Sequence, residues 1–142
     1  MEKPIKDAVS LIIKNEEDKT LFVLRSETKD SYPLVWSLPS SFIHNDETPQ
    51  DTVKRIGKDK LGVELKPIKL INEGKSDRGD FILFMHDYEA EVSSGTPSVV
   101  SDDYIEMKWE IPSVQFSTMQ EMGDCCRLYK EHLEGKSSQH SS

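Results

Sequence analysis

Cysteine is scarce in this sequence. Its 142 residues contain two cysteines, Cys125 and Cys126, which are adjacent. Neighbouring cysteines rarely bridge each other without strain, so the disulfide framework of a small secreted domain is not expected. A long hydrophobic run is also missing, because the apolar stretch near the N-terminus is too short for a signal peptide or a membrane span. These absences predict a cytoplasmic protein without a membrane partner.

Positive charge is in short supply as well. The chain has 18 lysines and arginines against 26 aspartates and glutamates, which gives a formal net charge of −8. A protein that grips the backbone of a nucleic acid needs a cluster of basic side chains, and the sequence has no such cluster. Nucleic acid is therefore not an expected partner. A small anionic ligand needs only a few well-placed cations and remains compatible with this composition.

Several common catalytic signatures are absent too. The four histidines are scattered without metal-ligand spacing. No serine lies in a nucleophile-elbow pattern, and no Walker-type phosphate loop is found. The chemistry must therefore be sought in carboxylates and cations.

Hydrophobic periodicity predicts a single domain over residues 1–134, followed by a polar, disordered tail at residues 135–142. Short β-branched and apolar runs predict strands, the first two joined as a hairpin by a polar turn at residues 15–19. Alternation in the last strand predicts one apolar face, made of Ile105, Met107, Trp109 and Ile111. The predicted strands cover residues 7–15, 20–25, 65–73, 81–92 and 104–111.

Two helices are predicted. The first covers residues 49–61, because Thr48 is a good N-cap, Pro49 suits the first helical position and Gly62 is placed to end it. The second covers residues 114–133, with an apolar stripe of Met119, Met122, Cys126, Tyr129 and Leu133. Strands mixed with helices that need sheet faces to cover predict an α/β fold with a mixed sheet between helices.

The segment from Ser41 to Val63 resembles a Nudix box, whose pattern is G-x5-E-x7-R-E-U-x-E-E-x-G-U with U aliphatic. Glu47, Arg55, Gly62 and Val63 stand in register without a gap, and the approach "WSLPSSF" is similar to the W-x-L-P-G-G-F entry of that family. The resemblance extends over about residues 5–134. It implies a Nudix-type α/β/α sandwich and hydrolysis of a nucleoside diphosphate linked to another group, assisted by Mg²⁺ or Mn²⁺.

The box departs from the family pattern at the positions that matter for metal. The resemblance implies three helix glutamates as metal ligands, and here those positions hold Ile56, Asp59 and Lys60. Ser41 replaces the first glycine, and Gly57 replaces an aliphatic residue. Mg²⁺ prefers several oxygen ligands, so one carboxylate beside an ammonium is a poor site for it. A reduced metal site could still combine Asp59 with Glu106 or with Glu47, although Lys60 would compete for these carboxylates.

The remaining box residues are expected to form its scaffold. The resemblance implies that Glu47 and Arg55 brace the loop against the helix by a salt bridge, with Ser41 and Gly62 shaping the two ends. Ile56 is expected to pack against the loop at residues 40–45. Two interpretations of Gly57 stay open: close approach to a strand, or relaxed selection on helix stability.

Three residues are candidates for substrate binding. Lys60 either takes the place of a metal and pairs with a diphosphate, or is a solvated lysine that pairs with a nearby acid. Arg25, at the end of a strand, either contacts phosphate or is simply exposed. Trp36 lies either near the cleft, where it could stack on a base, or away from it, whereas Trp109 is expected in the core.

Three hypotheses follow for function. The first is a Nudix protein with a degenerate catalytic box that binds a nucleoside diphosphate derivative with weak or no hydrolysis. The second is an active hydrolase with a reduced metal site in which Glu47, Asp59 and Glu106 take part. The third is a protein-interaction module on a Nudix scaffold. The sequence leaves open whether the protein is an enzyme and whether it forms a homodimer, as is common in this family.

Overall fold

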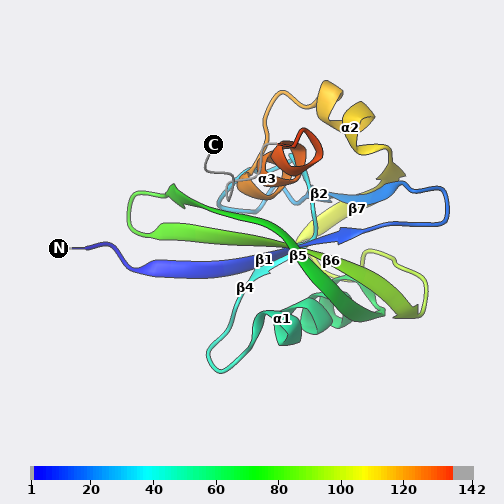
Figure 1. Cartoon of the computed structure of the whole chain (residues 1–142), viewed down its shortest axis with the longest axis horizontal. Helices are drawn as coiled ribbons and strands as arrows, with labels where there is room; N and C mark the ends of the chain where they lie inside the picture. The colour runs from blue at the N-terminus through cyan, green and yellow to red at the C-terminus, as the bar shows by residue number, and fades with distance from the viewer. Residues whose placement is uncertain (1, 136–142) are drawn as a thin grey trace.

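The structure is a computed structural model that describes residues 2–135. The predicted disordered tail lies outside the described residues, except for Gly135. Two sheets form the middle of the molecule, and helices cover both sides (Figure 1). This arrangement is the predicted α/β/α sandwich.

The four-stranded sheet has the order β4-β1-β6-β5. Its strands are β1 (Ile5–Ile13), β4 (Ser40–Phe42), β5 (Glu64–Asp77) and β6 (Ile82–Ser94). The sheet is mixed, because β1 pairs with β6 in parallel and its other pairings are antiparallel. The strand predicted at residues 7–15 is confirmed as β1, and its residues 8–13 are buried on both faces between β4 and β6.

The three-stranded sheet has the order β3-β2-β7. Its strands are β2 (Thr20–Arg25), β3 (Trp36–Ser37) and β7 (Tyr104–Glu110). The predicted hairpin of the first two strands is wrong, because β1 and β2 belong to different sheets and meet only at the isolated bridge between Lys14 and Thr20. Both strands are apolar enough to be buried in separate layers, so each finds its partners elsewhere.

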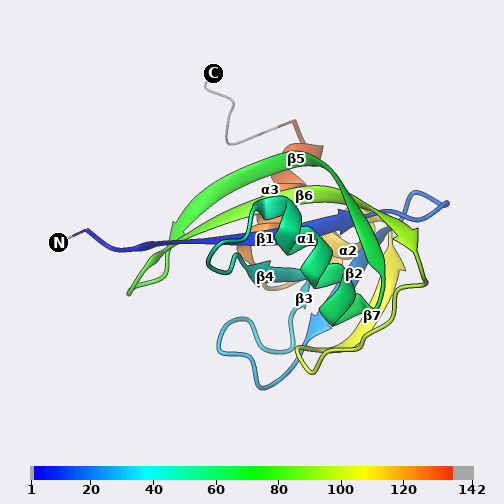
Figure 2. The same cartoon turned by 90° about the horizontal axis from the view of Figure 1, so that it is seen from below.

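The first predicted helix is confirmed, with a change in its last turn. Helix α1 (Pro49–Ile56) begins with a capping box in which Thr48 and Asp51 bond to each other's backbone N–H. The helix continues as the π-helical segment η1 (Gly57–Leu61) and ends at Gly62, whose φ of 69° is left-handed. The helix lies across the sheet face opposite α3 (Figure 2).

The second predicted helix is in fact two. Helix α2 (Pro112–Thr118) ends at Met119, and α3 (Asp124–Leu133) begins after Gly123. Both cap residues have extended backbone, so the predicted apolar stripe is interrupted between its methionines and Cys126. Met119 and Met122 still pack against the core below, but Leu133 is exposed.

The predicted apolar face of β7 is only half correct. Met107 and Trp109 pack against the core, whereas Ile105 and Ile111 are exposed. A β-bulge where β7 pairs with the end of β2 shifts the register, so that Tyr104 is buried instead.

Two core clusters lie on opposite faces of the four-stranded sheet. The first core cluster lies under α1 and η1, and the second under α2 and α3. The first contains Val9, Leu11, Ile13, Leu21, Val23, Val53, Ile56, Leu61, Val63, Leu65, Ala90 and Tyr104. The second contains Ala8, Ile12, Phe22, Leu38, Leu83, Met85, Phe116, Cys125, Cys126, Leu128 and Tyr129.

Candidate functional site

The brace between Glu47 and Arg55 is the best-formed part of the box. Arg55 donates from Nε to Glu47 Oε2 at 2.7 Å and from Nη2 to Oε1 at 3.1 Å. Glu47 Oε1 also accepts from the backbone of His44 and from the Thr52 hydroxyl. The Arg55 guanidinium lowers the pKa of Glu47 to about 2, against the opposing effect of burial. The carboxylate is therefore committed to holding the loop against α1.

Ser41 belongs to the same brace. Arg55 Nη1 donates to Ser41 Oγ at 3.2 Å, and Nη2 donates to the Phe42 carbonyl at 2.8 Å. One guanidinium thus fixes strand β4, the following loop and the helix together. The expected salt bridge between Glu47 and Arg55 is thus present, with Ser41 bonded to the same guanidinium.

Ile56 and Gly57 face the interior. Ile56 is fully buried in the first core cluster, against which Ile43 of the preceding loop also packs. A Cβ on Gly57 would lie 2.6 Å from Leu65 Cγ and 2.8 Å from Cδ1, closer than atoms can approach without movement. Of the two interpretations of Gly57, close approach to a strand therefore has direct structural support.

Lys60 points inward rather than to solvent. Its side chain is 14 % exposed, and Nζ donates to the Ser40 carbonyl at 2.7 Å and pairs with Asp103 Oδ2 at 2.8 Å. The ammonium also lies 5.4 Å from the centre of the Tyr104 ring. Burial lowers the pKa of Lys60, and the hydrogen bond to Asp103 opposes this shift. The predicted acid partner exists, but Lys60 is not solvated.

The described side chains do not fit a metal ion at the box. Asp59 and Glu106 are both exposed. Within residues 2–135, no group of three or more His, Cys, Asp or Glu side chains gathers closely enough to hold a metal. At the three positions where the family pattern has glutamates, Ile56 lies in the core, Asp59 is exposed and Lys60 is paired with an acid.

A cavity of about 610 Å³ opens beside Lys60. Its wall includes both sheets, the loop after β2 and the start of α3. The loops at residues 26–35 and 95–103 hang side by side at its rim (Figure 2), joined by the ion pair between Lys29 and Asp103 at 3.2 Å. Five cations and three carboxylates line it: Lys6, Arg25, Lys29, Lys60, Arg78, Asp30, Asp103 and Asp124.

Arg25 lines this cavity and supports its rim. Its Nε donates to the Ser31 carbonyl at 3.0 Å and Nη2 to the Ser31 hydroxyl at 3.2 Å. Tyr32, in the same loop, lies beside Gly123, and the Arg78 guanidinium lies 5.4 Å from the centre of its ring. The alternative of a simply exposed Arg25 is wrong, because the side chain is half-buried in the cavity wall.

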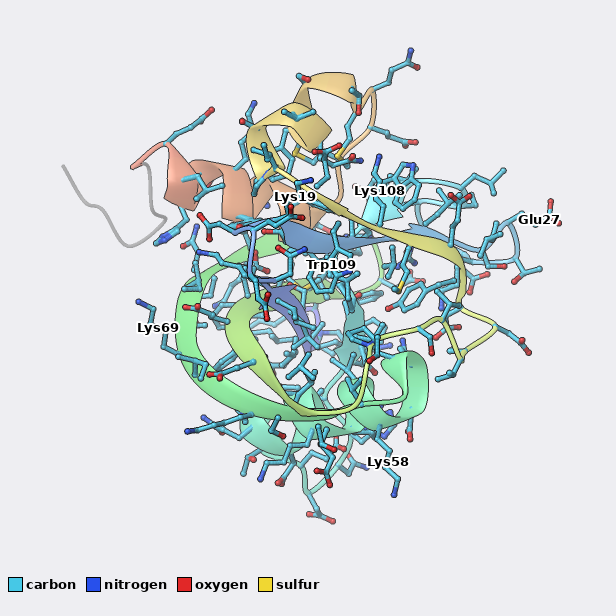
Figure 3. The ribbon with its side chains drawn as sticks, turned by 90° about the vertical axis from the view of Figure 1, so that its right-hand side faces the viewer. Lys19, Glu27, Lys58, Lys69, Lys108 and Trp109 are labelled. Atoms are coloured by element: carbon cyan, nitrogen blue, oxygen red, sulfur yellow. The ribbon has the colours of Figure 1, made fainter. Side chains whose placement is uncertain are left out.

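The two tryptophans take different places. Trp36 does not line the cavity: it packs against the second core cluster, and Lys108 Nζ lies 4.4 Å from the centre of its ring. Stacking of Trp36 on a base stays a prediction without structural support. Trp109 points toward the interior and Lys108 to the other side of β7 (Figure 3), and Trp109 is partly buried against the first core cluster.

A second cavity of about 760 Å³ lies outside the brace and is lined by Glu47. Its ionised groups are three carboxylates and one lysine, an arrangement that suits an anion poorly. The cavity beside Lys60 is therefore the candidate ligand site.

Sequence reasoning missed most of the charged residues of this site. Lys6, Lys29, Arg78 and Asp103 come from separate strands and loops, and no local motif connects them. The acidic partner of Lys60 was the one clue available, since a lysine beside the box calls for a carboxylate. The sequence does not show that Asp103 is this partner, because the two residues meet only in the folded chain.

Comparison with known proteins bears on the family and the fold. The sequence matches the NUDIX domain family over residues 4–124. No curated protein sequence is significantly similar to it. No helix among residues 2–135 has the length and apolar character needed to cross a membrane.

Many solved structures share the fold. The MutT protein from Methanosarcina mazei Go1 is 20% identical with a TM-score of 0.79, and the match covers 96% of this chain and 95% of that one. The MutT NUDIX hydrolase from Burkholderia pseudomallei is 19% identical with a TM-score of 0.78, over 92% and 99%. The NUDIX domain of Shewanella oneidensis NrtR, complexed with ADP ribose, is 19% identical with a TM-score of 0.66, over 95% and 89%.

Proposed function

The chain belongs to the Nudix family, and from this premise we propose that it binds a nucleoside diphosphate derivative in the cavity beside Lys60 with weak or no hydrolysis. The observation that carries the proposal is the Lys60 ammonium, only 14 % exposed, at a position where the family pattern has a metal-binding glutamate. The lysine supplies a positive charge that is part of the protein, at a position where the family pattern supplies a ligand for a metal ion.

The hydrogen-bonding capacity of Lys60 supports this role. An ammonium has three N–H donors, and two of them are used by Ser40 and Asp103. One donor remains for a ligand oxygen. Because the side chain is largely shielded from water, a charge-assisted hydrogen bond to phosphate is stronger there than at the surface.

The other cavity cations extend the same argument. Arg25 and Lys29 come from β2 and the loop after it, Lys6 comes from β1, and Arg78 comes from the turn between β5 and β6. Cations exceed carboxylates along the wall although the whole chain carries a net charge of −8. An anionic ligand therefore meets locally favourable charge. ADP ribose, the ligand of the Shewanella relative, is the first compound to test.

The carboxylates near the box give the reason to expect weak or no hydrolysis. Metal-assisted cleavage needs carboxylates that gather Mg²⁺ or Mn²⁺ around the diphosphate. Asp59 is exposed and Glu47 is committed to Arg55. Glu106, on β7, belongs to no group of three or more His, Cys, Asp or Glu side chains within residues 2–135 that could hold a metal.

The test is a turnover assay with ADP ribose and related nucleoside diphosphate derivatives, with Mg²⁺ or Mn²⁺ present. We expect turnover at or near the uncatalysed level, unchanged in Asp59→Ala. Robust metal-dependent turnover that disappears in Asp59→Ala would show an active hydrolase and overturn the proposal. If no compound binds and a protein copurifies, the interaction-module hypothesis gains instead.

A further inference from the structure

The carboxylate of Asp103 bridges two of the cavity lysines. Lys60 Nζ pairs with Asp103 Oδ2 at 2.8 Å, and Lys29 Nζ donates to Asp103 Oδ1 at 3.2 Å. Each carboxylate oxygen thus takes one ammonium. A phosphate group, which also carries several oxygens on one centre, can accept from two ammonium groups in the same way. Asp103 therefore resembles a ligand phosphate in the groups that it binds.

The surroundings of Asp103 keep its carboxylate ionised. The hydrogen bond from Lys60 is the largest influence and lowers the pKa of Asp103, burial opposes this effect, and Lys29 adds to it. The carboxylate is therefore charged at neutral pH and meets an incoming anion as a like charge. Like charges that are brought together at a partly shielded site repel each other. A ligand phosphate that approaches Lys60 must displace this carboxylate or bind against its repulsion.

Asp103 also acts as the internal counter-ion of a group of cations. Lys29 and Arg25 lower the pKa of Lys60 through their charge, whereas Asp103 raises it. The three cations thus repel one another, and the carboxylate between the two lysines compensates for this repulsion. An anion that enters the cavity can supply the same compensating charge. The exchange of Asp103 for a ligand phosphate therefore leaves the lysines with a counter-ion.

The backbone around Asp103 is held independently of its carboxylate. Its carbonyl accepts from the Ser26 N–H at 2.8 Å, and its N–H donates to Ser101 Oγ at 3.1 Å. The N–H of Val100 donates to the Lys60 carbonyl at 3.2 Å. The side chain of Asp103, by contrast, is 34 % exposed. A change of side-chain rotamer can therefore move the carboxylate toward solvent while the backbone stays in place.

We propose that Asp103 is an internal competitor of the ligand: its carboxylate holds Lys60 and Lys29 in the free protein, and a phosphate group displaces it to bind the same two ammonium groups. This inference rests on the ligand site proposed above and adds a residue that sets its affinity. Displacement frees one N–H donor on Lys60 and one on Lys29.

The competitor also gives the cavity a selectivity. A singly charged carboxylate ligand would only exchange one carboxylate for another at the two lysines. A diphosphate carries more negative charge and more acceptor oxygens, so it gains more from the exchange. The cavity should therefore favour diphosphates over singly charged anions such as acetate.

The test compares the wild type with Asp103→Asn and Asp102→Asn by calorimetric titration in EDTA, with inorganic pyrophosphate and ADP ribose as the probes. Asparagine has the size of aspartate and keeps an acceptor oxygen for Lys60, but it lacks the negative charge. We expect Asp103→Asn to bind both probes about three- to tenfold more tightly than the wild type does. Asp102 is exposed, so Asp102→Asn makes the same change in net charge and should bind like the wild type.

A measurement without ligand checks the contact itself. NMR spectra of the lysine side chains, with Lys60→Met to assign the signal, give the pKa of Lys60. This pKa should be lower in Asp103→Asn than in the wild type, because the carboxylate of Asp103 raises it. An unchanged pKa would show that the two groups do not pair in solution and would overturn the proposal. A melting curve confirms that each variant is folded.

The binding outcomes separate this inference from the proposed function. Binding that is unchanged or weaker in Asp103→Asn overturns the competitor and leaves the ligand site standing, because Asp103 would then order the site. An equal gain in Asp102→Asn also overturns it, since net charge alone would explain the effect. Binding to Asp103→Asn without measurable binding to the wild type supports the competitor and overturns the proposed function. Absence of binding to both proteins overturns both.

Discussion

Gly57 shows at the scale of one residue why the helix departs from the family pattern. A glycine inside a helix costs about 1 kcal/mol relative to alanine, so its presence needs a reason. The reason is contact: η1 lies so close to β5 that a methyl group would meet the side chain of Leu65. Its neighbour Ile56 fills the core at the same place. At the position of Ile56 the family pattern has a metal-binding glutamate, whereas here both residues serve packing against the core.

Gly57→Ala should therefore destabilise the protein in spite of better helix propensity. The overpacked methyl group costs about 1–3 kcal/mol, which is only partly offset by the propensity gain. Urea unfolding measures the change. Leu65→Ala removes the two nearest contacts and leaves the Val63 carbonyl oxygen at 3.1 Å, so in that background the same substitution should cost less. Equal costs in both backgrounds would contradict the contact.

Glu47 gives a second prediction at this scale, on pH. Its folded pKa of about 2 lies below the ordinary value of 4.5. The brace thus contributes stability that is present above pH 4.5 and is lost as the pH falls toward 2. The size is on the order of 1–2 kcal/mol at neutral pH, because one pKa unit corresponds to about 1.4 kcal/mol and solvent screening weakens an ion pair near the surface.

The measurement is urea unfolding of wild type and Glu47→Gln at several pH values. The wild type should be more stable by a margin that is constant from pH 8 to 5 and shrinks below pH 4.5. Glu64→Gln, at an exposed glutamate on β5, is the matched control and should show no such change. A margin that does not change with pH would contradict the account.

At the scale of elements, the continuous helix from Pro49 to Leu61 positions the site. The capping box at Thr48 fixes its start, and Gly62 fixes its end. Ile56, the last residue of α1, lies in the core, and Lys60 of the π-helical segment that follows lines the cavity. If the first turn of this helix unfolded, both Ile56 and Lys60 would be held less firmly in place.

Thr48→Ala should cost about 1 kcal/mol, because the N–H of Asp51 then loses its acceptor. Lys54→Ala, on the exposed face of the same helix, is the control and should change stability by less than about 0.5 kcal/mol. Hydrogen exchange should show faster opening of the first turn of α1 in Thr48→Ala. Equal effects of the two substitutions would argue against the cap.

Elements also show how far sequence reasoning reaches. The start and end of the first helix were predictable, because capping residues act locally. The break at residues 119–123 and the bulge at Tyr104 were not, since both depend on packing against strands distant in sequence. The hairpin prediction failed for the same reason: adjacency along the chain does not fix which sheet a buried strand joins.

At the scale of the whole molecule, charged residues that are distant in sequence line one cavity. The salt bridge between Glu47 and Arg55 was predictable because the two residues follow the fixed spacing of the box, and the structure contains it. The cavity wall was not, because its cations come from elements that meet only in the folded chain. At this scale we propose that Lys60 and its neighbours bind an anion directly, without a metal between them.

A calorimetric titration of ADP ribose in EDTA, on wild type, Lys60→Met and Lys58→Met, tests this claim most directly. Lys58 is exposed on the same helical segment and points away from the molecule (Figure 3), which makes it the matched control. Wild type and Lys58→Met should bind in EDTA with similar affinity, and Lys60→Met should bind at least about tenfold more weakly. Binding that requires Mg²⁺ and is unchanged by Lys60→Met would contradict the account.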